Sequence, residues 1–342
     1  RRLRGQPAQA RIGGVTRGFA LAFAGVPGAT YLAHLVPWWR QPLIFLITLV
    51  AVIDAAIYLV AARGPWHRRP LGPEGFVAAL TFVVIGVDLL TGARLQMSSL
   101  AGYSPVVAGR FAGVGNVAFA VFATGALLCA AALCVRRTPR QSVAIVAAVG
   151  VVAVVIDGSP LWGSDFGGVL ALVPSFALLG VLVSGRRPTW RLLSVIAVAA
   201  VAVVATFALL DYARPADAQT HLGRFVGQLL HGGAGAVVRR KAEANFRLLT
   251  RSVLTLVVPL AVVFLTMVLL RPMGGLRRAF DAVPELRAGL ISVLVMGVAG
   301  FAFNDSGVAV PALALTIAVP IALAASLAHR QDATAHPPRT PA

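Results

Sequence analysis

The sequence has few charged residues, few acids and almost no cysteine. Charged residues make up only 12% of the 342 residues, and 12 residues in all are acidic. An ordinary soluble domain carries about a quarter charged residues, so this composition excludes one. The two cysteines, Cys129 and Cys134, lie in one apolar run and form neither a disulfide framework nor a metal knuckle. The six histidines lack the paired spacing of metal sites, so we expect no metal and no cofactor.

Hydrophobic residues are abundant instead. They make up 58% of the chain, and the mean hydropathy is +0.84. They fall into about ten runs, most of them long enough to cross a hydrocarbon core about 30 Å thick as a helix. The sequence therefore predicts an all-α, polytopic membrane protein with about ten transmembrane helices. The expected spans are 16–36, 42–62, 74–92, 116–135, 142–156, 167–184, 192–210, 252–270, 287–303 and 307–328.

The basic residues give an independent indication of topology. If the N-terminus is cytoplasmic, that side of the membrane receives 20 of the 30 Lys and Arg residues. The other side receives ten, seven of which lie in one long connection between 214 and 251, where the positive-inside rule counts least. We therefore expect an even number of crossings in the plasma membrane, with both ends cytoplasmic. A basic balance of this kind indicates cytoplasmic loops and not a nucleic-acid partner.

The composition of the chain divides it into three parts. Residues 1–15 are expected to form a basic cytoplasmic flank, residues 16–330 a helical membrane domain, and the Pro-rich residues 331–342 a disordered tail. Within the domain, residues 213–251 form an outer segment. From His221 to Leu249 the apolar residues recur at helical spacing, with a break at Gly232-Gly233, which predicts two amphipathic helices on the membrane surface.

Charged residues flanked by glycine recur on the outer face only. The connections there contain Gly109-Arg110 to Gly115-Asn116, Gly163-Ser164-Asp165 to Gly168, and Asn304-Asp305. Because a charge buried in a bundle needs a partner or a ligand, we expect these residues to meet around one cavity. The expected substrate-binding residues are Arg110, Asn116, Lys241 and Asn304, and the expected catalytic residues are Asp165 and Asp305. Asp165 has an alternative role as the N-cap of the next helix, and the basic residues have one in binding lipid headgroups.

Asp54 lies in the middle of the second expected span. A carboxylate in the hydrocarbon region costs several kcal/mol, about 3 by insertion scales, so Asp54 should face the bundle interior. Tyr58, one turn later, is a local candidate partner. A packing role and a role in proton transfer both remain open for this residue.

Six motifs in this order resemble a known family: Leu35-Val-Pro-Trp-Trp-Arg40, Gly109 to Asn116, Gly158 to Gly168, His221-Leu-Gly-Arg-Phe225, Arg240-Lys-Ala-Glu-Ala-Asn245 and Phe303-Asn-Asp-Ser-Gly307. The chain resembles the C-terminal polytopic membrane region of a family of actinobacterial cell-envelope proteins with relatives in Firmicutes. In that family the region typically follows an extracytoplasmic domain similar to alkaline phosphatases. The resemblance implies that such a domain precedes Arg1. An outer domain there requires a further crossing upstream or a re-entrant first segment, or else an inverted topology; the charge pattern favours the first two, and we keep the orientation that it indicates.

A looser similarity exists to O-antigen ligases and polymerases, which use undecaprenyl-linked sugars. The shared features are an Arg-and-Asn loop, here Arg110 to Asn116, and a later small-residue loop, here Asp165 to Gly168. The usual Asn-Pro-Asn and Ser-Arg sequences of those enzymes are missing from the chain.

Three functions are compatible with these observations. The first is an envelope protein that binds, transfers or translocates an anionic lipid-linked or phosphorylated glycan at its extracytoplasmic face. The second is a proton-coupled secondary transporter, for which Asp54 and the outer acids would carry protons. The third is a non-catalytic membrane anchor or scaffold for the upstream domain. Membrane lipids are expected partners in all three, and whether the protein is an enzyme stays open.

Overall fold

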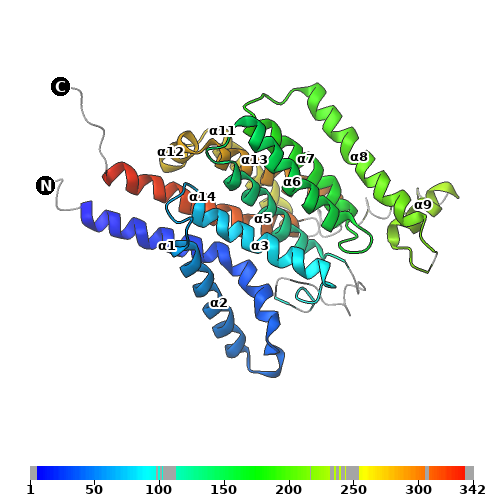
Figure 1. The fold of residues 1–342 in the computed structure, drawn as a ribbon, viewed down its shortest axis with the longest axis horizontal. Helices are drawn as coiled ribbons and strands as arrows, with labels where there is room; N and C mark the ends of the chain where they lie inside the picture. Colours follow the sequence, from blue (N-terminus) through cyan, green and yellow to red (C-terminus); the bar gives the residue numbers. More distant parts are fainter. Residues whose placement is uncertain are drawn as a thin grey trace.

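The computed structural model describes residues 6–97, 99–100, 102, 113–215, 217–231, 235, 239, 243, 254–304 and 308–335. Every regular element within these residues is a helix, which confirms the predicted all-α class. The helices form a bundle in which consecutive long helices run in opposite directions (Figure 1). Their bounds are α1 Gln6–Leu32, α2 Leu43–Arg63, α3 Gly72–Leu90, α5 Asn116–Cys134, α6 Pro139–Gly158, α7 Phe166–Val183, α8 Trp190–Tyr212, α9 His221–Leu230, α11 Leu254–Leu270, α12 Gly274–Ala282, α13 Pro284–Phe303 and α14 Ala309–Ala335.

Helix α5 is the centre of the bundle. It packs against α3, α6, α7, α13 and α14, and 83% of its most hydrophobic window is buried. It is built from alanine, leucine, valine and phenylalanine and carries no charged residue. Small side chains let its neighbours approach closely, which is how membrane helices gain packing energy without a hydrophobic driving force. At Gly125, for example, a Cβ atom would lie 2.9 Å from the carbonyl oxygen of Ala78 on α3.

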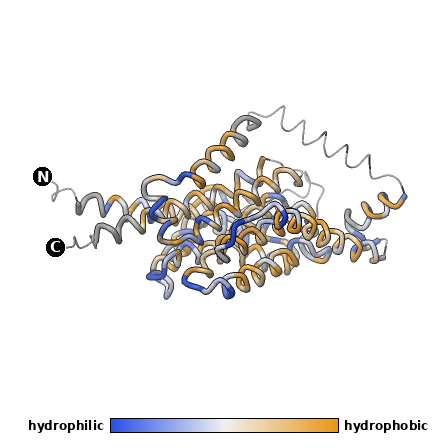
Figure 2. Tube along the Cα trace, turned by 90° about the horizontal axis from the view of Figure 1, so that it is seen from above, coloured by the Kyte–Doolittle hydropathy of each residue, from blue (hydrophilic) through white to orange (hydrophobic). Residues whose placement is uncertain are grey.

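The other helices surround α5. α1 lies along α14, and α13 lies between α5, α7 and α14. α2 and α8 are at the periphery, with only 11% and 17% of their apolar windows buried. Their exposed side chains are almost all hydrophobic, for example Ile47, Val52, Val198 and Val201. Hydrophobic residues cover the helices and hydrophilic ones gather at the connections (Figure 2), as expected for a bundle surrounded by lipid.

Nine of the described helices are long and apolar enough to cross a membrane, or ten if a bent pair counts as one span. The pair is Leu260–Leu270 with Gly274–Ala282, which meet at 59°. This agrees with the predicted number of about ten. α1 begins and α14 ends at the same end of the bundle, which matches the even number of crossings expected from the charges (Figures 1 and 2).

The predicted boundaries differ from the structure mainly at the two ends of the chain. α1 begins at Gln6, within the segment expected to be a basic flank, and α14 continues to Ala335, within the expected tail. The prediction from hydrophobic runs missed these extensions because they lie beyond the runs. The short fifth span, 142–156, is a complete helix, Pro139–Gly158. Thr138 caps it in a reciprocal pair of hydrogen bonds with Gln141. Polar residues therefore extend the helix beyond the apolar run.

The two ends of the bundle differ in charge. At the end where α2, α5 and α7 finish, the connections carry Arg63, Arg68, Arg69, Arg136, Arg137, Arg186 and Arg187; we call this the basic end. At the opposite end, where α3, α6 and α8 finish, lie the buried acids Asp88, Asp157, Asp165 and Asp211; we call this the acidic end. The candidate site lies at the acidic end.

Candidate functional site at the acidic end

Two connections of the bundle are hydrogen bonded to each other at the acidic end. The backbone NH of Val114, just before α5, donates to the carbonyl oxygen of Gly163 in the α6–α7 connection at 2.8 Å. Gly113 lies directly against the same carbonyl group and has a φ of 86°. A side chain at this position would meet both the carbonyl group and the unfavourable backbone conformation, so glycine is required here. The contact brings the start of α5 next to the start of α7.

Asp157 and Asp165 lie on either side of this connection. Asp157, in the last turn of α6, is fully buried, and Asp165 is 5% exposed. The NH of Asp165 donates to the carbonyl oxygen of Asp157 at 3.0 Å. Both carboxylates face Gly168: a Cβ atom there would lie 2.8 Å from Oδ2 of Asp165 and closer still to Oδ2 of Asp157. The two carboxylates are therefore neighbours in a site largely closed to water.

Asp165 occupies the position that the sequence suggested for a helix cap, but its side chain does not act as one. It is the N-cap residue of α7 and makes no capping hydrogen bond. Its Oδ2 atom lies beside Gly168, the third residue of α7, without the hydrogen bond of a cap. Asp165 therefore does not act as a helix cap, which is the role that most aspartates have at this position.

Asn304 joins the cluster from α13. It lies just after the last turn of α13 and is 4% exposed. Its Oδ1 atom is in direct contact with Gly167 in the first turn of α7, next to the glycine that the two carboxylates face. Its Nδ2 atom has no hydrogen-bond partner among the described residues. A buried NH₂ group without a partner costs free energy, about 1–3 kcal/mol, and is the kind of group that a ligand satisfies.

Gln96 lies at the same end of the bundle, bonded to the start of α5, whose Val114 is in turn bonded to the α6–α7 connection. It is fully buried, and its Oε1 atom accepts a hydrogen bond from the NH of Gly115 at 2.9 Å. Its Nε2 atom, like Nδ2 of Asn304, has no partner among the described residues. Asn116 follows as the first residue of α5 and is partly exposed. We call Gln96, Asp157, Asp165 and Asn304 the acidic-end cluster.

Asp88 and Tyr31 support the loop that carries Gln96. Oδ1 of Asp88 accepts a hydrogen bond from the NH of Leu95 at 2.7 Å, which closes the turn after α3. Tyr31 on α1 is fully buried and interacts electrostatically with Asp88. Sequence reasoning missed Asp88, Gln96 and the role of Asp157. The sequence signal that could have found Asp88 is the Thr91-Gly92 pair three residues later, which is typical of a closed turn after a helix.

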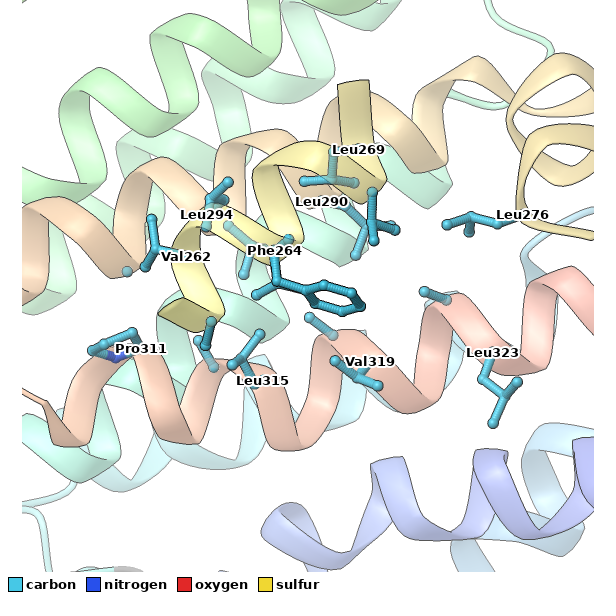
Figure 3. Close-up of a pocket in the computed structure, with 18 of the residues that line it drawn as sticks. Val262, Phe264, Leu269, Leu276, Leu290, Leu294, Pro311, Leu315, Val319 and Leu323 are labelled. Carbon is cyan, nitrogen blue, oxygen red and sulfur yellow. The ribbon is translucent and has the colours of Figure 1, made fainter. Parts of the chain in front are cut away.

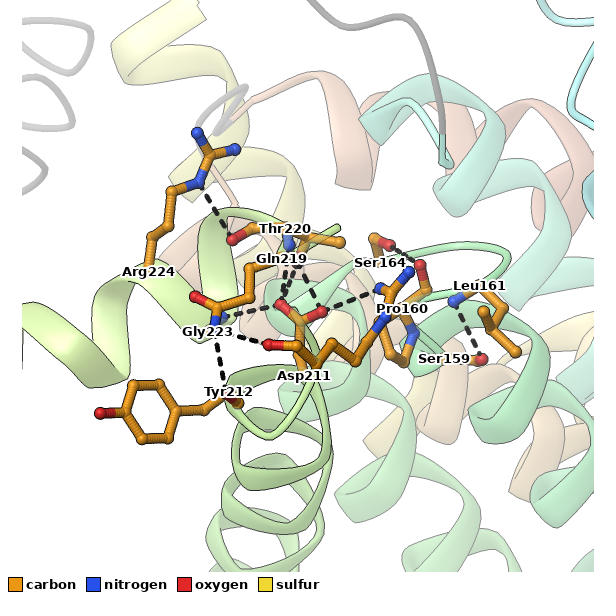
Figure 4. A network of polar contacts seen from close by, with 11 residues as sticks. Ser159, Pro160, Leu161, Ser164, Asp211, Tyr212, Gln219, Thr220, Gly223 and Arg224 are labelled. Atoms are coloured by element: carbon orange, nitrogen blue, oxygen red, sulfur yellow. Dashed lines mark hydrogen bonds and ion pairs between the residues drawn. The ribbon is translucent and has the colours of Figure 1, made fainter. Parts of the chain in front are cut away.

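Asp211 organises a second polar network nearby, at the end of α8 (Figure 4). Its buried carboxylate accepts hydrogen bonds from Oγ1 of Thr220 at 2.6 Å, from the NH of Gly223 at 2.7 Å and from Arg214 at 3.0 Å. These bonds satisfy donors at the start of α9, as a capping carboxylate does. Each of these hydrogen bonds is local, which indicates that Asp211 is a structural residue that fixes the direction of α9.

Helix α9 occupies the first part of the segment, His221 to Leu249, in which the sequence predicts two surface helices. It is amphipathic, packs against α8 and exposes Leu229 and Leu230 to 59% and 65%. The first of the two expected helices is therefore present. The second falls mostly on residues outside the described part of the chain. Within it, Arg239 and Glu243 are helical and form an ion pair at 3.0 Å.

The other expected site residues are distributed as follows. Arg110, Lys241 and Asp305 lie outside the described residues. Asp54 faces α1, where its Oδ1 atom lies against Gly25, and this buried atom has no hydrogen-bond partner among the described residues. The expected contact with Tyr58 is absent from the described hydrogen bonds; the Tyr58 hydroxyl lies against Gly18 on α1 instead. Asp54 is therefore remote from the cluster, since α3, α5 and α7 follow α2 in that order across the bundle.

A long apolar groove runs along α13 and α14 and is closed on one side by α11 (Figure 3). Its volume is about 580 Å³. At the acidic end it is lined by Val308 and Pro311, and towards the basic end by Leu276, Leu323 and Leu327. Ser326 is the only polar side chain among the described residues that line it. The groove begins four residues after Asn304, at the same turn between α13 and α14.

The chain matches no protein-family model, no curated protein and no solved structure. Its composition and its fold together establish an integral, multi-pass helical membrane protein.

Proposed function

We propose that this protein binds an anionic lipid-linked or phosphorylated glycan at its acidic end and serves its transfer or translocation in the cell envelope. The observation that carries the proposal is the relation between the groove and the cluster. An apolar groove lined by α14 from Val308 to Leu327 begins four residues after Asn304, and Asn304 lies against Gly167, next to the glycine that Asp157 and Asp165 face. This arrangement suits an amphiphile with a long hydrocarbon tail and a polar head.

The groove has the chemistry of a tail site. Its walls are formed by leucine, valine and alanine of α13 and α14, with Phe264 of α11 facing it (Figure 3). A site of about 580 Å³ is of the size that holds small ligands or a section of a hydrocarbon chain. Because Phe264, Val319 and Leu323 of its lining are exposed on the surface of the bundle, a lipid can enter it from the membrane.

The cluster has the chemistry of a glycan site. Carboxylates accept and carboxamides donate hydrogen bonds, and sugar hydroxyls need both. Nε2 of Gln96 and Nδ2 of Asn304 supply donors without a described partner. In this proposal Arg110 and Lys241 bind the phosphoryl oxygens of the substrate, and Asn116 binds next to them, because guanidinium and ammonium groups form charge-assisted hydrogen bonds with phosphate.

For transfer, one carboxylate acts as a base. The hydroxyl group of an acceptor attacks the sugar carbon bonded to phosphate, and the bond to the phosphate oxygen breaks with its electron pair. Asp165 or Asp305 accepts the proton of the attacking hydroxyl group. Asp165 has the better described position, since it is buried beside Asp157 and is not used as a cap.

The two alternatives have less support. A proton-coupled transporter needs polar groups along the bundle, and the described central helix α5 has no charged residue between Asn116 and Cys134. A scaffold needs no buried amide without a partner, whereas the described structure has two. The proposal also places the acidic end outside the plasma membrane, the C-terminus in the cytoplasm, and an extracytoplasmic domain before Arg1, all three from the charge pattern and the family resemblance.

The test is direct binding by the purified protein in lipid nanodiscs. Native mass spectrometry would compare an undecaprenyl-diphosphate-linked disaccharide with undecaprenyl phosphate. We expect tighter binding of the disaccharide compound, and a loss of about tenfold or more in Asp165→Asn, which keeps the side-chain volume but removes the charge. Asp217→Asn, an exposed acid at the same end, is the matched control and should bind normally.

A second pair of variants tests the groove. Leu315→Trp fills it and should weaken binding of both compounds, because both have the same tail. Val201→Trp adds the same bulk on α8, where Val201 is 62% exposed, and should have no effect. Equal binding by all four variants, or no binding by the parent protein, would contradict the proposal and favour the scaffold.

A further inference from the structure

A second site lies at the opposite, basic end of the bundle, and the proposed function does not use it. It is a pocket of about 500 Å³ between the start of α3 and the end of α5. The loop of residues 64–71 forms one side and the turn of residues 135–137 the other. We call it the basic-end pocket.

The rim of the basic-end pocket carries three positive charges. Arg69 belongs to one loop and Arg136 and Arg137 to the other, and all three are exposed. None of them has an ion-pair partner among the described residues. Three arginines that converge on one pocket from two loops repel each other, and an anion between them removes that repulsion.

The two acids near the pocket do not neutralise it. Glu74, in the first turn of α3, is 2% exposed and forms its ion pair with Arg17 of α1 at 3.3 Å. Glu285, in the first turn of α13, interacts with Cys134 of α5 and forms no ion pair with the three arginines among the described residues. The rim therefore keeps a net positive charge.

The interior of the basic-end pocket is apolar. Phe76 and Ala79 of α3 and Cys129, Ala132 and Leu133 of α5 line it. Leu133 is 51% exposed, so this wall is continuous with the lipid-facing surface of the bundle. Trp66 stacks on Phe76 with ring centroids 4.5 Å apart, and its Nε1 atom donates to the carbonyl oxygen of Ala61 at 3.2 Å. A basic rim above an apolar wall matches an amphiphile with an anionic head and excludes a purely polar ligand.

The backbone around the pocket is strained in two places. Leu71 and Arg136 have φ values of 55° and 60°, the left-handed conformation that costs a residue with a side chain about 1 kcal/mol. Both residues line the pocket. Strained conformations persist where the surrounding structure fixes them and gather at ligand sites. They provide a second observation, independent of charge, that points to the same place.

We propose that the basic-end pocket binds one anionic phospholipid of the adjacent membrane leaflet. Its phosphodiester group lies between Arg69, Arg136 and Arg137, and an acyl chain follows Phe76 and Leu133 along α3 and α5. Basic pockets between transmembrane helices are suited to such headgroups, and arginine binds phosphate through two donors at once. The lipid links α3 to α5, the central helix, and does not depend on the glycan proposal.

Trp66 provides a local reporter for the experiment. In a protein with Trp38, Trp39, Trp162 and Trp190 replaced by phenylalanine, Trp66 is the only tryptophan. The full chain in detergent micelles is titrated with dibrominated phosphatidylglycerol or dibrominated phosphatidylcholine, and quenching of Trp66 is measured. We expect half-maximal quenching at a phosphatidylglycerol fraction about tenfold lower than for phosphatidylcholine.

Two double variants distinguish a specific site from general attraction. Arg136→Gln/Arg137→Gln should reduce the preference for phosphatidylglycerol to nearly none. Arg187→Gln/Arg191→Gln removes the same charge from the same end, away from the pocket, and should keep the preference. Arg69→Gln, on the other loop, should give an intermediate loss and guards against a folding defect in the turn at 135–137.

Three results would overturn the proposal. Equal quenching by the two lipids in the parent protein removes the headgroup preference. An equal loss of the phosphatidylglycerol preference in the two double variants would assign that preference to the total positive charge of the basic end and not to the pocket. Displacement of phosphatidylglycerol by inorganic phosphate at millimolar concentration identifies a site for soluble phosphate and not for a lipid.

Discussion

The carboxamide of Asn304, at the end of α13, lies against Gly167 in the first turn of α7. The contact joins segments that are far apart in the sequence, and the next residue of α7, Gly168, is the glycine that the carboxylates of Asp157 and Asp165 face. This arrangement depends on the absence of a side chain at two consecutive positions. The positions of Asn304, Asp157 and Asp165 therefore depend on Gly167-Gly168 in the first turn of α7.

Gly167→Ala tests this dependence. A Cβ atom would clash with Oδ1 of Asn304 and lie 3.0 Å from the carbonyl oxygen of Phe303, so α7 and α13 must separate. We expect a loss of about 1–3 kcal/mol in the free energy of unfolding, measured by thermal or denaturant unfolding in detergent. Gly180→Ala is the matched control on the same helix, where the nearest atom would be Val146 Cγ1 at 3.7 Å. A similar loss in both variants would show that the contact at Asn304 is not special.

The Arg17–Glu74 ion pair is a second testable feature. Glu74 is almost fully buried and Arg17 keeps 28% of its side-chain exposure. Removing the charge of Arg17 leaves a buried carboxylate without its counter-charge, which costs about 3–5 kcal/mol in comparable pairs. We therefore expect Arg17→Gln to be more destabilising than Glu74→Gln in detergent unfolding. The double variant should recover much of the loss, and an additive loss would contradict the pair.

Asp211 should hold α9 in place. Asp211→Ala removes the acceptor for Thr220, Gly223 and Arg214 together, so the start of α9 loses its cap. We expect hydrogen exchange in residues 221–230 to become at least about tenfold faster, with little change in the rest of the bundle. Asp217→Ala, an exposed acid in the same connection, should leave exchange unchanged. Unchanged exchange in Asp211→Ala would mean that packing on α8 alone fixes α9.

The positive-inside pattern predicts the orientation. With Cys129 and Cys134 buried, single cysteines at exposed positions report their side of the membrane to an impermeant thiol reagent. Leu161→Cys and Asp217→Cys, at the acidic end, should be labelled in intact cells, and Arg187→Cys, at the basic end, only after permeabilisation. The reverse pattern would invert the topology and place the cluster in the cytoplasm.

Much of the fold follows from the sequence because the bilayer imposes it. Each hydrophobic run must form a helix of about the bilayer thickness, so runs such as 116–135 predict helices such as α5 directly. Helix ends such as Gln6 and Ala335 were missed because they extend beyond the apolar region, where hydropathy gives no signal.

The candidate site was less predictable for a physical reason. The sequence singled out Asp165 and Asn304 as charged or polar residues of the outer connections, but the contact of Asn304 with α7 depends on how α7 packs on α13, which hydropathy does not encode. Asp157 was missed because the turn of residues 158–164 folds back, with the NH of Gly163 donating to the carbonyl oxygen of Ile156 and Ser164 at a φ of 52°. A positive φ at a serine is uncommon, and no sequence signal marks it.

Photo-crosslinking with an undecaprenyl-diphosphate-linked disaccharide tests the proposed function most directly, with a diazirine group placed in its tail. The crosslinked residues of the nanodisc-embedded protein are identified by peptide mass spectrometry. The proposal predicts crosslinks to groove residues of α14 and α13, such as Leu315, Val319 and Leu294, and their loss in Asp165→Asn, which no longer holds the head. Crosslinks spread evenly over exposed helices such as α8, or unchanged in Asp165→Asn, would contradict a joint site for tail and head.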